Sequence, residues 1–493
     1  MKSISKSFML VIICVLLIAI SGSVTAAVTT KTLATNFTVA NLSSSTATVN
    51  VAYYKADGSV WEADLANTTF TLPPDGGQKQ IRQYFDTTMD DGTGSAVISS
   101  DQPVAALSLL LTRSGTPTSG GYSGIMNPNS VFYVPLVMKN LTTANGIANS
   151  QLVIQNTTAE NIQVTIDLKP DPATSLSGTL KNVNLSANAT LIYDLDTEAG
   201  LVNGWNGSAV ITGVNSKNIS VISNLFIGPD LLYTTSGFSS NQITDSWYVP
   251  YYASKFINGQ NTSVTVQNLS GGTIAENDLV MICKKDENNP GVNEISFTNG
   301  IAVPNNGSFT FNAAALATSP VDWFGSCFVE TSSGDKNLAV SVYVRHIGNP
   351  TNGGGSAFEG IPAPSLTNVE LYKKITVPYI AKALGNGVAS SLNIQNLSSS
   401  DANVTLKYTA SAEYSGLPQS YTTSIITIPA GQSLLRNYRY ATSSSTSEPS
   451  LPEGWFGSLV VESDQPVQVY SFITNRASAI GDTYFGFTGF LKP

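Results

Sequence analysis

Apolar and polar side chains alternate along several short segments that are rich in Val, Ile, Thr and Tyr. In one segment Val404, Leu406 and Tyr408 alternate with Thr405 and Lys407. The same rhythm recurs at Val49, Val51 and Tyr53, and again at Val164, Ile166 and Leu168. Because successive side chains of a strand point to opposite faces, this period of two predicts β-strands with one buried and one wet face. Convincing helical periodicity is absent beyond residue 26, so we predict an all-β fold.

Three landmarks recur in a fixed order along the chain, which indicates tandem repeats. The first contains a turn after a strand and reads ANLSSSTATVNVAYY (40–54), QNTTAENIQVTIDL (155–168), QNLSGGTIAENDLVMIC (267–283) and QNLSSSDANVTLKY (395–408). The second lies downstream, as GTGSAVISSDQPVAAL (92–107), WNGSAVITG (205–213), WFGSCFVE (323–330) and WFGSLVVESDQPVQVY (455–470). The third lies upstream of three copies, as YVPLVMKN (133–140), YVPYYASK (248–255) and TVPYIAKA (376–383).

Each repeat is long enough to hold a hydrophobic core of its own. We predict a signal peptide at 1–26 followed by four tandem antiparallel β-sandwich domains of immunoglobulin-like size. The domains are repeat 1 (27–128), repeat 2 (129–243), repeat 3 (244–368) and repeat 4 (369–493). Short joins rich in Gly, Ser and Pro predict that the domains form a moderately stiff rod.

Repeat 1 departs from the other repeats at its start. The stretch that corresponds to the Val-Pro strand falls inside the signal peptide, so repeat 1 is predicted to lack its first strand and to expose a sheet edge. Another chain, or the N-terminal segment of a neighbour, could add a strand there and drive head-to-tail assembly. Alternatively, residues 27–33 themselves form a shorter edge strand.

The order of the three landmarks resembles the tandem immunoglobulin-like β-sandwich repeats of bacterial secreted and cell-surface proteins. In that family a Val-Pro strand, a QN turn and a GSAV strand with DQPV follow one another, and the similarity covers nearly the whole chain beyond residue 26. The resemblance implies display, adhesion or coating of the cell envelope rather than a defined reaction.

The N-terminus has the parts of a secretory signal peptide. Lys2 and Lys6 precede the apolar run MLVIICVLLIAI (9–20), and small residues lead to a cleavage position after Ala26. The apolar run is short for a membrane-spanning helix. We therefore expect an extracellular or cell-surface protein, without membrane insertion of the mature chain.

Composition narrows the range of partners and of chemistry. The chain has 24 Lys and Arg against 33 Asp and Glu, a net charge of −9, which argues against nucleic acid as a partner because nucleic-acid affinity depends on basic side chains. Only 12% of the residues are charged while 42% are hydrophobic. Such a chain can bury cores, but it has few groups for acid–base catalysis.

Two kinds of residue recur at one position in the repeats. Asparagine follows a strand in all four, where it suits a turn because its side chain can bond to nearby backbone and it tolerates the left-handed conformation. These predicted turn residues are Asn41, Asn156, Asn268 and Asn396. Tryptophan lies at a strand entrance in three repeats, as Trp205, Trp323 and Trp455. A packing role is the preferred interpretation of the tryptophans, and an exposed row that stacks sugars is the alternative.

The two cysteines beyond the signal peptide, Cys283 and Cys327, both lie in repeat 3 and in phase with inward-facing residues. We expect their strands to oppose each other across the sandwich. A disulfide between them suits an exported protein, and two buried free thiols are the alternative.

Three acidic runs could offer oxygen ligands to calcium, namely DLDTE (194–198), MDD (89–91) and KKDENN (284–289). None has the spacing of a calcium loop, so solvated loop charge is the preferred interpretation and we predict no cofactor. The single histidine, His346, lacks an accompanying nucleophile motif. We predict no catalytic residues and no enzyme.

These observations favour a noncatalytic surface, coat or spacer protein that contacts cell-envelope components, glycans or copies of itself. An adhesin that binds carbohydrate or protein through its inter-strand loops is the alternative. A secreted hydrolase that uses His346 is a third hypothesis.

Overall fold

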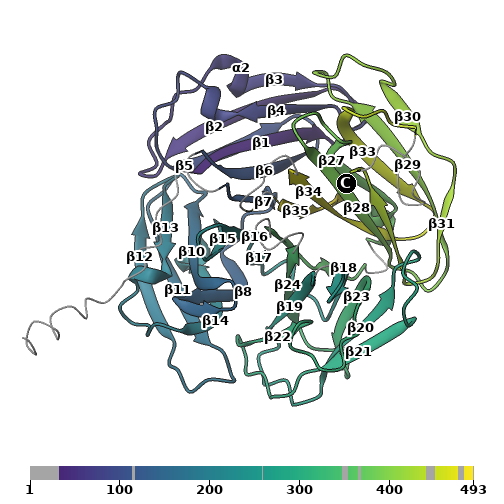
Figure 1. The fold of residues 1–493 in the computed structure, drawn as a ribbon. Helices are drawn as coiled ribbons and strands as arrows, with labels where there is room; N and C mark the ends of the chain where they lie inside the picture. The colour runs from purple at the N-terminus through teal and green to yellow at the C-terminus, as the bar shows by residue number, and fades with distance from the viewer. Residues whose placement is uncertain are drawn as a thin grey trace, which may run out of the picture. The chain divides into compact units, whose positions relative to one another are not determined.

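The computed structural model describes residues 33–113, 117–257, 259–346, 354–364, 368–439, 450–475, 482 and 484–491. Strands follow one another along this part of the chain, from purple at β1 to yellow at the C-terminal strands (Figure 1), and all their pairings are antiparallel. The predicted all-β fold is confirmed. The predicted signal peptide at 1–26 lies outside the described residues.

Each repeat contains one sheet that includes the strand before the recurring asparagine, and we call it sheet I. In repeat 1 its order is β4 (Gln78–Arg82), β1 (Leu33–Asn41), β6 (Val104–Thr112) and β7 (Ser119–Ser123). In repeat 2 it is β13 (Thr190–Asp194), β10 (Gly146–Asn156), β15 (Ile219–Ile227) and β16 (Leu231–Ser236), with β9 (Leu141–Thr143) paired to β10. Repeat 3 has β22 (Ser308–Asn312), β19 (Asn261–Asn268), β24 (Leu338–His346) and β25 (Gly354–Glu359). Repeat 4 has β32 (Ser433–Asn437), β28 (Val388–Asn396), β34 (Val467–Asn475) and β35 (Tyr484–Thr488).

The other sheet of each repeat, sheet II, contains the Gly-Ser landmark strand. In repeat 1 its order is β3 (Thr69–Leu72), β2 (Ala47–Lys55) and β5 (Gly94–Ser100). In repeat 2 it is β12 (Thr179–Leu185), β11 (Ile162–Pro170), β14 (Trp205–Gly213), β8 (Val131–Lys139) and β17 (Phe238–Ser239). Repeat 3 has β21 (Glu294–Thr298), β20 (Leu279–Lys285), β23 (Trp323–Thr331), β18 (Ser246–Ser254) and β26 (Ile361–Pro362). Repeat 4 has β30 (Ser420–Thr422), β29 (Ala402–Ala410), β33 (Phe456–Ser463), β27 (Lys374–Ala381) and β36 (Phe490–Leu491), with β31 (Ile426–Ile428) paired to β29.

Helical structure in the described residues is limited to short turns between strands. They are α2 (Leu65–Thr68), η1 (Gln83–Phe85), η2 (Leu195–Thr197), η3 (Val214–Ser216) and η4 (Val369–Lys373). Among these residues no helix has the length and apolar character needed to cross a membrane.

The two sheets of a repeat pack face to face around the apolar residues that the alternation predicted to point inward. In repeat 2, Leu152 and Ile154 of sheet I meet Val164, Ile166 and Ile211 of sheet II in one buried cluster. Strands β2, β11 and β29 all alternate buried and more exposed positions along their length. Burial of one face therefore fixes the register of each strand, because a slip by one residue would turn its apolar side chains outward.

Sheet II of repeat 1 is shorter than its counterparts. In repeats 2 to 4 the first strand of the repeat (β8, β18 or β27) lies beside the Gly-Ser strand, and a short last strand (β17, β26 or β36) lies beyond it. In repeat 1 the sheet ends at β5, and no strand of the described residues pairs with the free edge of β5. Residues 27–32, most of the alternative edge strand, lie outside the described residues.

The repeats contact one another through the last strands of their sheets I. Strand β16 of repeat 2 contacts β7 of repeat 1 and β25 of repeat 3, and β35 of repeat 4 contacts β25 and β7. Repeat 4 therefore contacts repeat 1, and the series of contacts between repeats is closed. The hydroxyl of Ser119 in β7, for example, donates to the carbonyl oxygen of Tyr484 in β35 at 3.1 Å. The predicted rod is therefore wrong, since Thr32–Pro493 forms one compact unit. Whether each repeat folds by itself stays a prediction.

A second set of contacts joins each first strand to the next repeat. Strand β8 packs on β19 and β24 of repeat 3, and β18 packs on β28 and β34 of repeat 4. Strand β27 of repeat 4 packs in the same way on β1 and β6 of repeat 1. A first strand thus completes its own sandwich and also covers sheet I of its neighbour.

Candidate functional site

The recurring asparagines lie in one kind of buried corner. In repeat 4 the Asn396 Nδ2 donates to the carbonyl oxygens of Ser400 at 2.7 Å and Ile428 at 3.0 Å, while Oδ1 accepts from the Ser398 amide at 2.9 Å. The side chain thereby ties its own turn to the chain that enters β32. The Asn396 side chain is fully buried. Its hydrogen bonds therefore satisfy backbone groups that cannot reach water at this corner.

The same pattern holds in the other three repeats. The corresponding Nδ2 donates to the carbonyl oxygen four residues on and to a crossing segment, in Asn41 to Ser45 and Pro73, in Asn156 to Glu160 and Ser186, and in Asn268 to Gly272 and Val303. None of the four asparagines has a positive φ. Their side-chain bonds, rather than a left-handed backbone, account for the recurrence.

The Asp-Gln-Pro landmark of repeats 1 and 4 supports this corner. Ser398 Oγ donates to Gln465 Oε1 at 3.2 Å, and Asp464 Oδ1 accepts from the Asn403 amide at 2.8 Å. In repeat 1 the equivalent bonds join Ser43 to Gln102 and Thr48 to Asp101. These acidic and amide side chains are therefore engaged in holding two turns together.

The three strand-entrance tryptophans are buried. Trp205, Trp323 and Trp455 are each at most 1% exposed. Their indole N–H groups donate to backbone oxygens of Ser177, Val292 and Pro418, at 3.0, 2.9 and 3.1 Å. Rings buried in this way are not available to stack sugars, so the geometry fits the packing interpretation.

Repeat 1 fills the corresponding space differently. It has Gly92 two residues before the Gly-Ser pair, where the other repeats have tryptophan. The ring of Trp61, which comes from the segment after β2, lies within 3.4 Å of a side chain that would be built at Gly92. A hollow of about 270 Å³ remains beside it, lined also by Lys55, Asp57 and Asp91.

Cys283 and Cys327 form a disulfide. They lie directly opposite each other on the adjacent strands β20 and β23. The expectation that their strands face each other across the sandwich is therefore wrong, because both belong to sheet II. Both residues are buried, and the bond links two neighbouring strands of one sheet.

The acidic runs bind protein groups. Asp194 accepts from the amides of Asn149 and Gln151 at 3.0 and 2.9 Å, and Glu198 pairs with Lys181 at 3.0 Å. Within the described ranges, no group of three or more His, Cys, Asp and Glu could hold a metal ion. The side chain of His346 lies outside the described residues.

The run at 284–289 has a structural use at the contact between repeats 3 and 4. Asp286 is fully buried, and its Oδ2 accepts from the Ser433 hydroxyl of β32 at 2.9 Å. Burial raises the pKa of Asp286 to about 6, although its hydrogen bonds act in the opposite direction. This carboxyl group titrates near neutral pH at a junction.

A second buried carboxylate, Asp482, joins all four repeats. Its oxygens accept from the amides of Leu232 and Gly355 at 3.1 and 3.0 Å, and its own amide donates to Pro117 at 2.9 Å. Burial holds its pKa well above the usual range of an aspartate. Sequence reasoning missed this residue, because it is a lone acid that does not recur between repeats.

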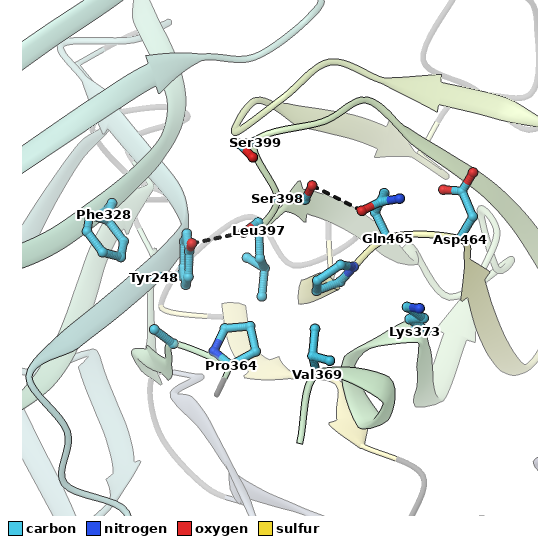
Figure 2. Close-up of a pocket in the computed structure, with 12 residues that line it drawn as sticks. Tyr248, Phe328, Pro364, Val369, Lys373, Leu397, Ser398, Ser399, Asp464 and Gln465 are labelled. Atoms are coloured by element: carbon cyan, nitrogen blue, oxygen red, sulfur yellow. Dashed lines mark hydrogen bonds between the residues drawn. The ribbon is translucent and has the colours of Figure 1, made fainter. Parts of the chain in front are cut away.

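A surface hollow of about 430 Å³ lies where repeats 3 and 4 meet. Figure 2 shows Tyr248 and Phe328 on one side of it and Lys373 and Asp464 on the other. The two aromatic rings are 4.9 Å apart, and the Tyr248 hydroxyl donates to the Leu397 carbonyl oxygen at 2.9 Å. Asp464 already accepts two hydrogen bonds from Asn403, and Lys373 pairs with Glu370, so the aromatic pair is the feature of the hollow best suited to contact a small ligand.

Comparisons with known proteins do not identify a family. No protein-family model matches the chain, and no curated protein matches it. A crystal structure of Thermotoga maritima 1070 is 17% identical over 23% of this chain and 97% of its own, with a TM-score of 0.20. The tetra-tandem repeat of the extending region of a large adhesion protein is 15% identical over 90% of this chain and 91% of its own, with a TM-score of 0.09. Escherichia coli alpha-2-macroglobulin activated by porcine elastase is 12% identical over 93% and 43%, also at 0.09. Structural similarity at these TM-scores indicates neither a shared fold nor a shared function.

Proposed function

We propose that this protein is a noncatalytic, exported component of a cell surface that serves as a coat or spacer. The observation that carries the proposal is the use of its recurring polar and aromatic side chains. Asn396 and Trp455, like their counterparts, are buried and bonded to backbone atoms. Four copies of a reactive or binding site would instead present their recurring residues to solvent.

Two further features, a disulfide and a contact between distant repeats, support an exported protein with a stable fold. The disulfide between Cys283 and Cys327 closes a separation of 44 residues, which stabilises a fold by roughly 3–4 kcal/mol in the chain-entropy account and suits an oxidising compartment. Contacts between β7 and β35 connect the first repeat to the last. The mechanism would be geometric, since a rigid body holds its loops at fixed positions toward envelope components or other copies.

Immunogold labelling of intact cells, combined with negative-stain images of the purified chain from Ala27, tests the proposal. Cells without the gene serve as the control for the antibody. We expect surface label, with a regular lattice or filament for a coat and separate particles for a spacer. Label confined to the cell interior contradicts the proposal.

The hollow between repeats 3 and 4 favours an adhesin as the second candidate, because Tyr248 and Phe328 could stack a sugar ring. A glycan array probed with the chain from Ala27 tests this function. Binding that is lost in Phe328→Ala but kept in Leu417→Ala, an exposed apolar residue outside the hollow, would select it. No binding to any glycan removes the carbohydrate form of this candidate.

A further inference from the structure

In repeat 1 no strand of the described residues occupies the position that the first strand takes in repeats 2 to 4, and we call this position the strand slot. One wall is the free edge of β5, and the other is the pair Ile125–Met126. That pair corresponds to β17, because Gly124 donates to the Ala106 carbonyl oxygen as Gly237, just before β17, donates to Val221, at 2.7 and 2.8 Å. In repeats 2 to 4 a first strand lies between these two walls.

The side chains around the slot are more exposed than their counterparts. Ala209 and Ile211 of β14 are fully buried, whereas the equivalent Ala96 and Ile98 of β5 are only half-buried. In the Ile125–Met126 pair on the other side of the slot, the Met126 side chain is 56% exposed. Apolar surface in this position is what a first strand covers in the complete repeats.

Among the described residues, sheet I of repeat 2 is less covered at the same place than sheet I of repeats 3 and 4. Gln267 and Gln395 donate from Nε2 to the carbonyl oxygens of Ala209 and Cys327, which belong to the preceding repeat. Their counterpart Gln155 has a buried Nε2 for which the structure gives no hydrogen-bond partner. The first strands β8, β18 and β27 pack on the following repeat at the other three junctions, so the missing strand would have lain against repeat 2.

The predicted signal-peptide cleavage would separate repeat 1 from the part of the sequence that corresponds to its first strand. The connectors after β8, β18 and β27 span residues 140–145, 255–260 and 382–387. By the same spacing before Leu33, residues 18–26 of the sequence correspond to a first strand and residues 27–32 to its connector. Cleavage after Ala26 would therefore leave the connector without the strand, and the occupant must come from another polypeptide.

The three first strands define the chemistry of the occupant. They read VFYVPLVMK, SWYVPYYAS and KITVPYIA, and their alternate apolar residues are buried, in β8 Phe132, Val134 and Val137. Each has Val-Pro at its centre, where the pairing with the Gly-Ser strand shifts register. A bulge at this point tolerates proline, which has no N–H to donate to a ladder.

We propose that the strand slot binds an extended segment of a second, different protein by β-strand addition, with apolar residues at alternate positions and Val-Pro at the centre. Main-chain hydrogen bonds to β5 supply affinity, and the half-buried side chains of Ala96 and Ile98 select the apolar side chains of the segment. This inference does not depend on the coat or spacer function.

The first test uses the chain from Ala27 and a fluorescein-labelled peptide with the sequence of β8. Fluorescence anisotropy should show saturable binding, and the same peptide with Asp in place of Phe132, Val134 and Val137 should bind at least tenfold more weakly. Hydrogen exchange of β5 amides should slow at least tenfold in the complex, while β14 amides should not change. No binding, or slowing only outside β5, overturns the proposal.

A chain with the strand added in cis is the matched control. Residues 131–145, which are β8 and its connector, are placed directly before Leu33. This graft should raise the melting temperature and weaken peptide binding at least tenfold, whereas a graft with the three Asp substitutions should do neither. Equal peptide binding by both grafted chains shows that the peptide binds elsewhere and overturns the proposal. A dimer of the chain from Ala27 in sizing chromatography would assign the slot to a second copy and also overturn it.

Discussion

Repeats 1 and 4 contain almost the same corner but complete their sandwiches differently. Asn41 and Asn396 make the same side-chain bonds, supported by Gln102 in one repeat and Gln465 in the other. In repeat 4, β27 and Trp455 close the core, whereas repeat 1 ends its sheet II at β5. The turn and the closure of the sandwich are therefore separate features, because repeat 1 keeps the turn although no first strand lies beside β5 among the described residues.

The largest expected difference concerns the tryptophans. Trp455→Ala should lower the free energy of unfolding by about 4 kcal/mol, because it opens a cavity in a closed core and leaves the Pro418 carbonyl oxygen without its donor. Trp61→Ala should have about half this effect, since Trp61 is only partly buried in an open core. Chemical denaturation measures the losses, and hydrogen exchange of β33 and β5 assigns each to its repeat. Equal losses would show that repeat 1 is as closed as repeat 4.

Substitution of the corner asparagines should affect both repeats equally. Asn41→Ala and Asn396→Ala each leave at least two backbone carbonyl oxygens without a donor, which should lower the free energy of unfolding by about 3 kcal/mol. Asparagine-to-aspartate variants keep the Oδ1 acceptor but should lose more, because they bury a carboxylate oxygen against carbonyl oxygens that need a donor. The same denaturation and exchange measurements apply. A loss in repeat 4 alone would mean that the corner depends on closure after all.

The strands could be predicted from local sequence, and the recurring asparagines and tryptophans lie in equivalent buried positions. Alternation reports one-sided burial directly, as in β29, where Val404, Leu406 and Tyr408 are buried. A residue that recurs at one position, such as Asn396, points to a shared backbone need. Alternation is visible within a single repeat, and recurrence is visible once the repeats are aligned.

Contacts between repeats could not be predicted in this way. Strands β7, β16, β25 and β35 contact one another, yet their Gly- and Ser-rich sequences resemble linkers. Asp482 meets amides of Leu232 and Gly355 that are more than a hundred residues away. Such pairings depend on where whole repeats lie, which no local pattern records. For the same reason, the sequence indicated that Cys283 pairs with Cys327 but not that both lie in one sheet.

The junction of repeats 3 and 4 and the junction of repeats 1 and 2 should respond differently to pH. Burial raises the pKa of Asp286 to about 6, while an aspartate in an unfolded chain titrates near 3.9. The folded state therefore holds the proton more tightly, and its contribution to stability is full below about pH 4 and is lost as pH rises through 6. Between pH 5 and 7 this loss is about 1.3 kcal/mol.

Asp286→Asn should remove this part of the pH dependence, as measured by denaturation at a series of pH values. The matched position in repeat 1 is Ala56, because Lys55 and Lys285 both pair with the first glycine of a Gly-Ser strand. Ala56 meets repeat 2 by a backbone bond from Thr190 at 3.0 Å, and its side chain has no ionisable group, so this position does not titrate. An unchanged pH profile in Asp286→Asn would assign the dependence to another group.

The smallest expected difference in stability between repeats 4 and 1 comes from an ion pair on the surface of sheet II. Glu462 of β33 pairs with Lys374 of the first strand at 3.0 Å and with Lys407 of β29 at 2.6 Å. Burial opposes ionisation of Glu462, but the two lysines outweigh it and lower its pKa. Glu462→Gln should reduce the free energy of unfolding by about 0.5 kcal/mol, because the partners are partly exposed and solvent screens the pairs.

Repeat 1 supplies the control for this ion pair. Its matched residue is Ser99, since Ser99 pairs with Asn50 of β2 as Glu462 pairs with Thr405 of β29. Without a first strand, no counterpart of Lys374 lies beside Ser99 among the described residues, so Ser99→Glu should change stability by less than about 0.5 kcal/mol. Thermal denaturation in low salt and in 1 M NaCl measures both variants, and high salt should abolish most of the Glu462→Gln effect. A loss above about 2 kcal/mol that persists in high salt would mean that Glu462 acts through packing of β27 against β33, which would make the first strand, rather than its charge, the source of the difference between the repeats.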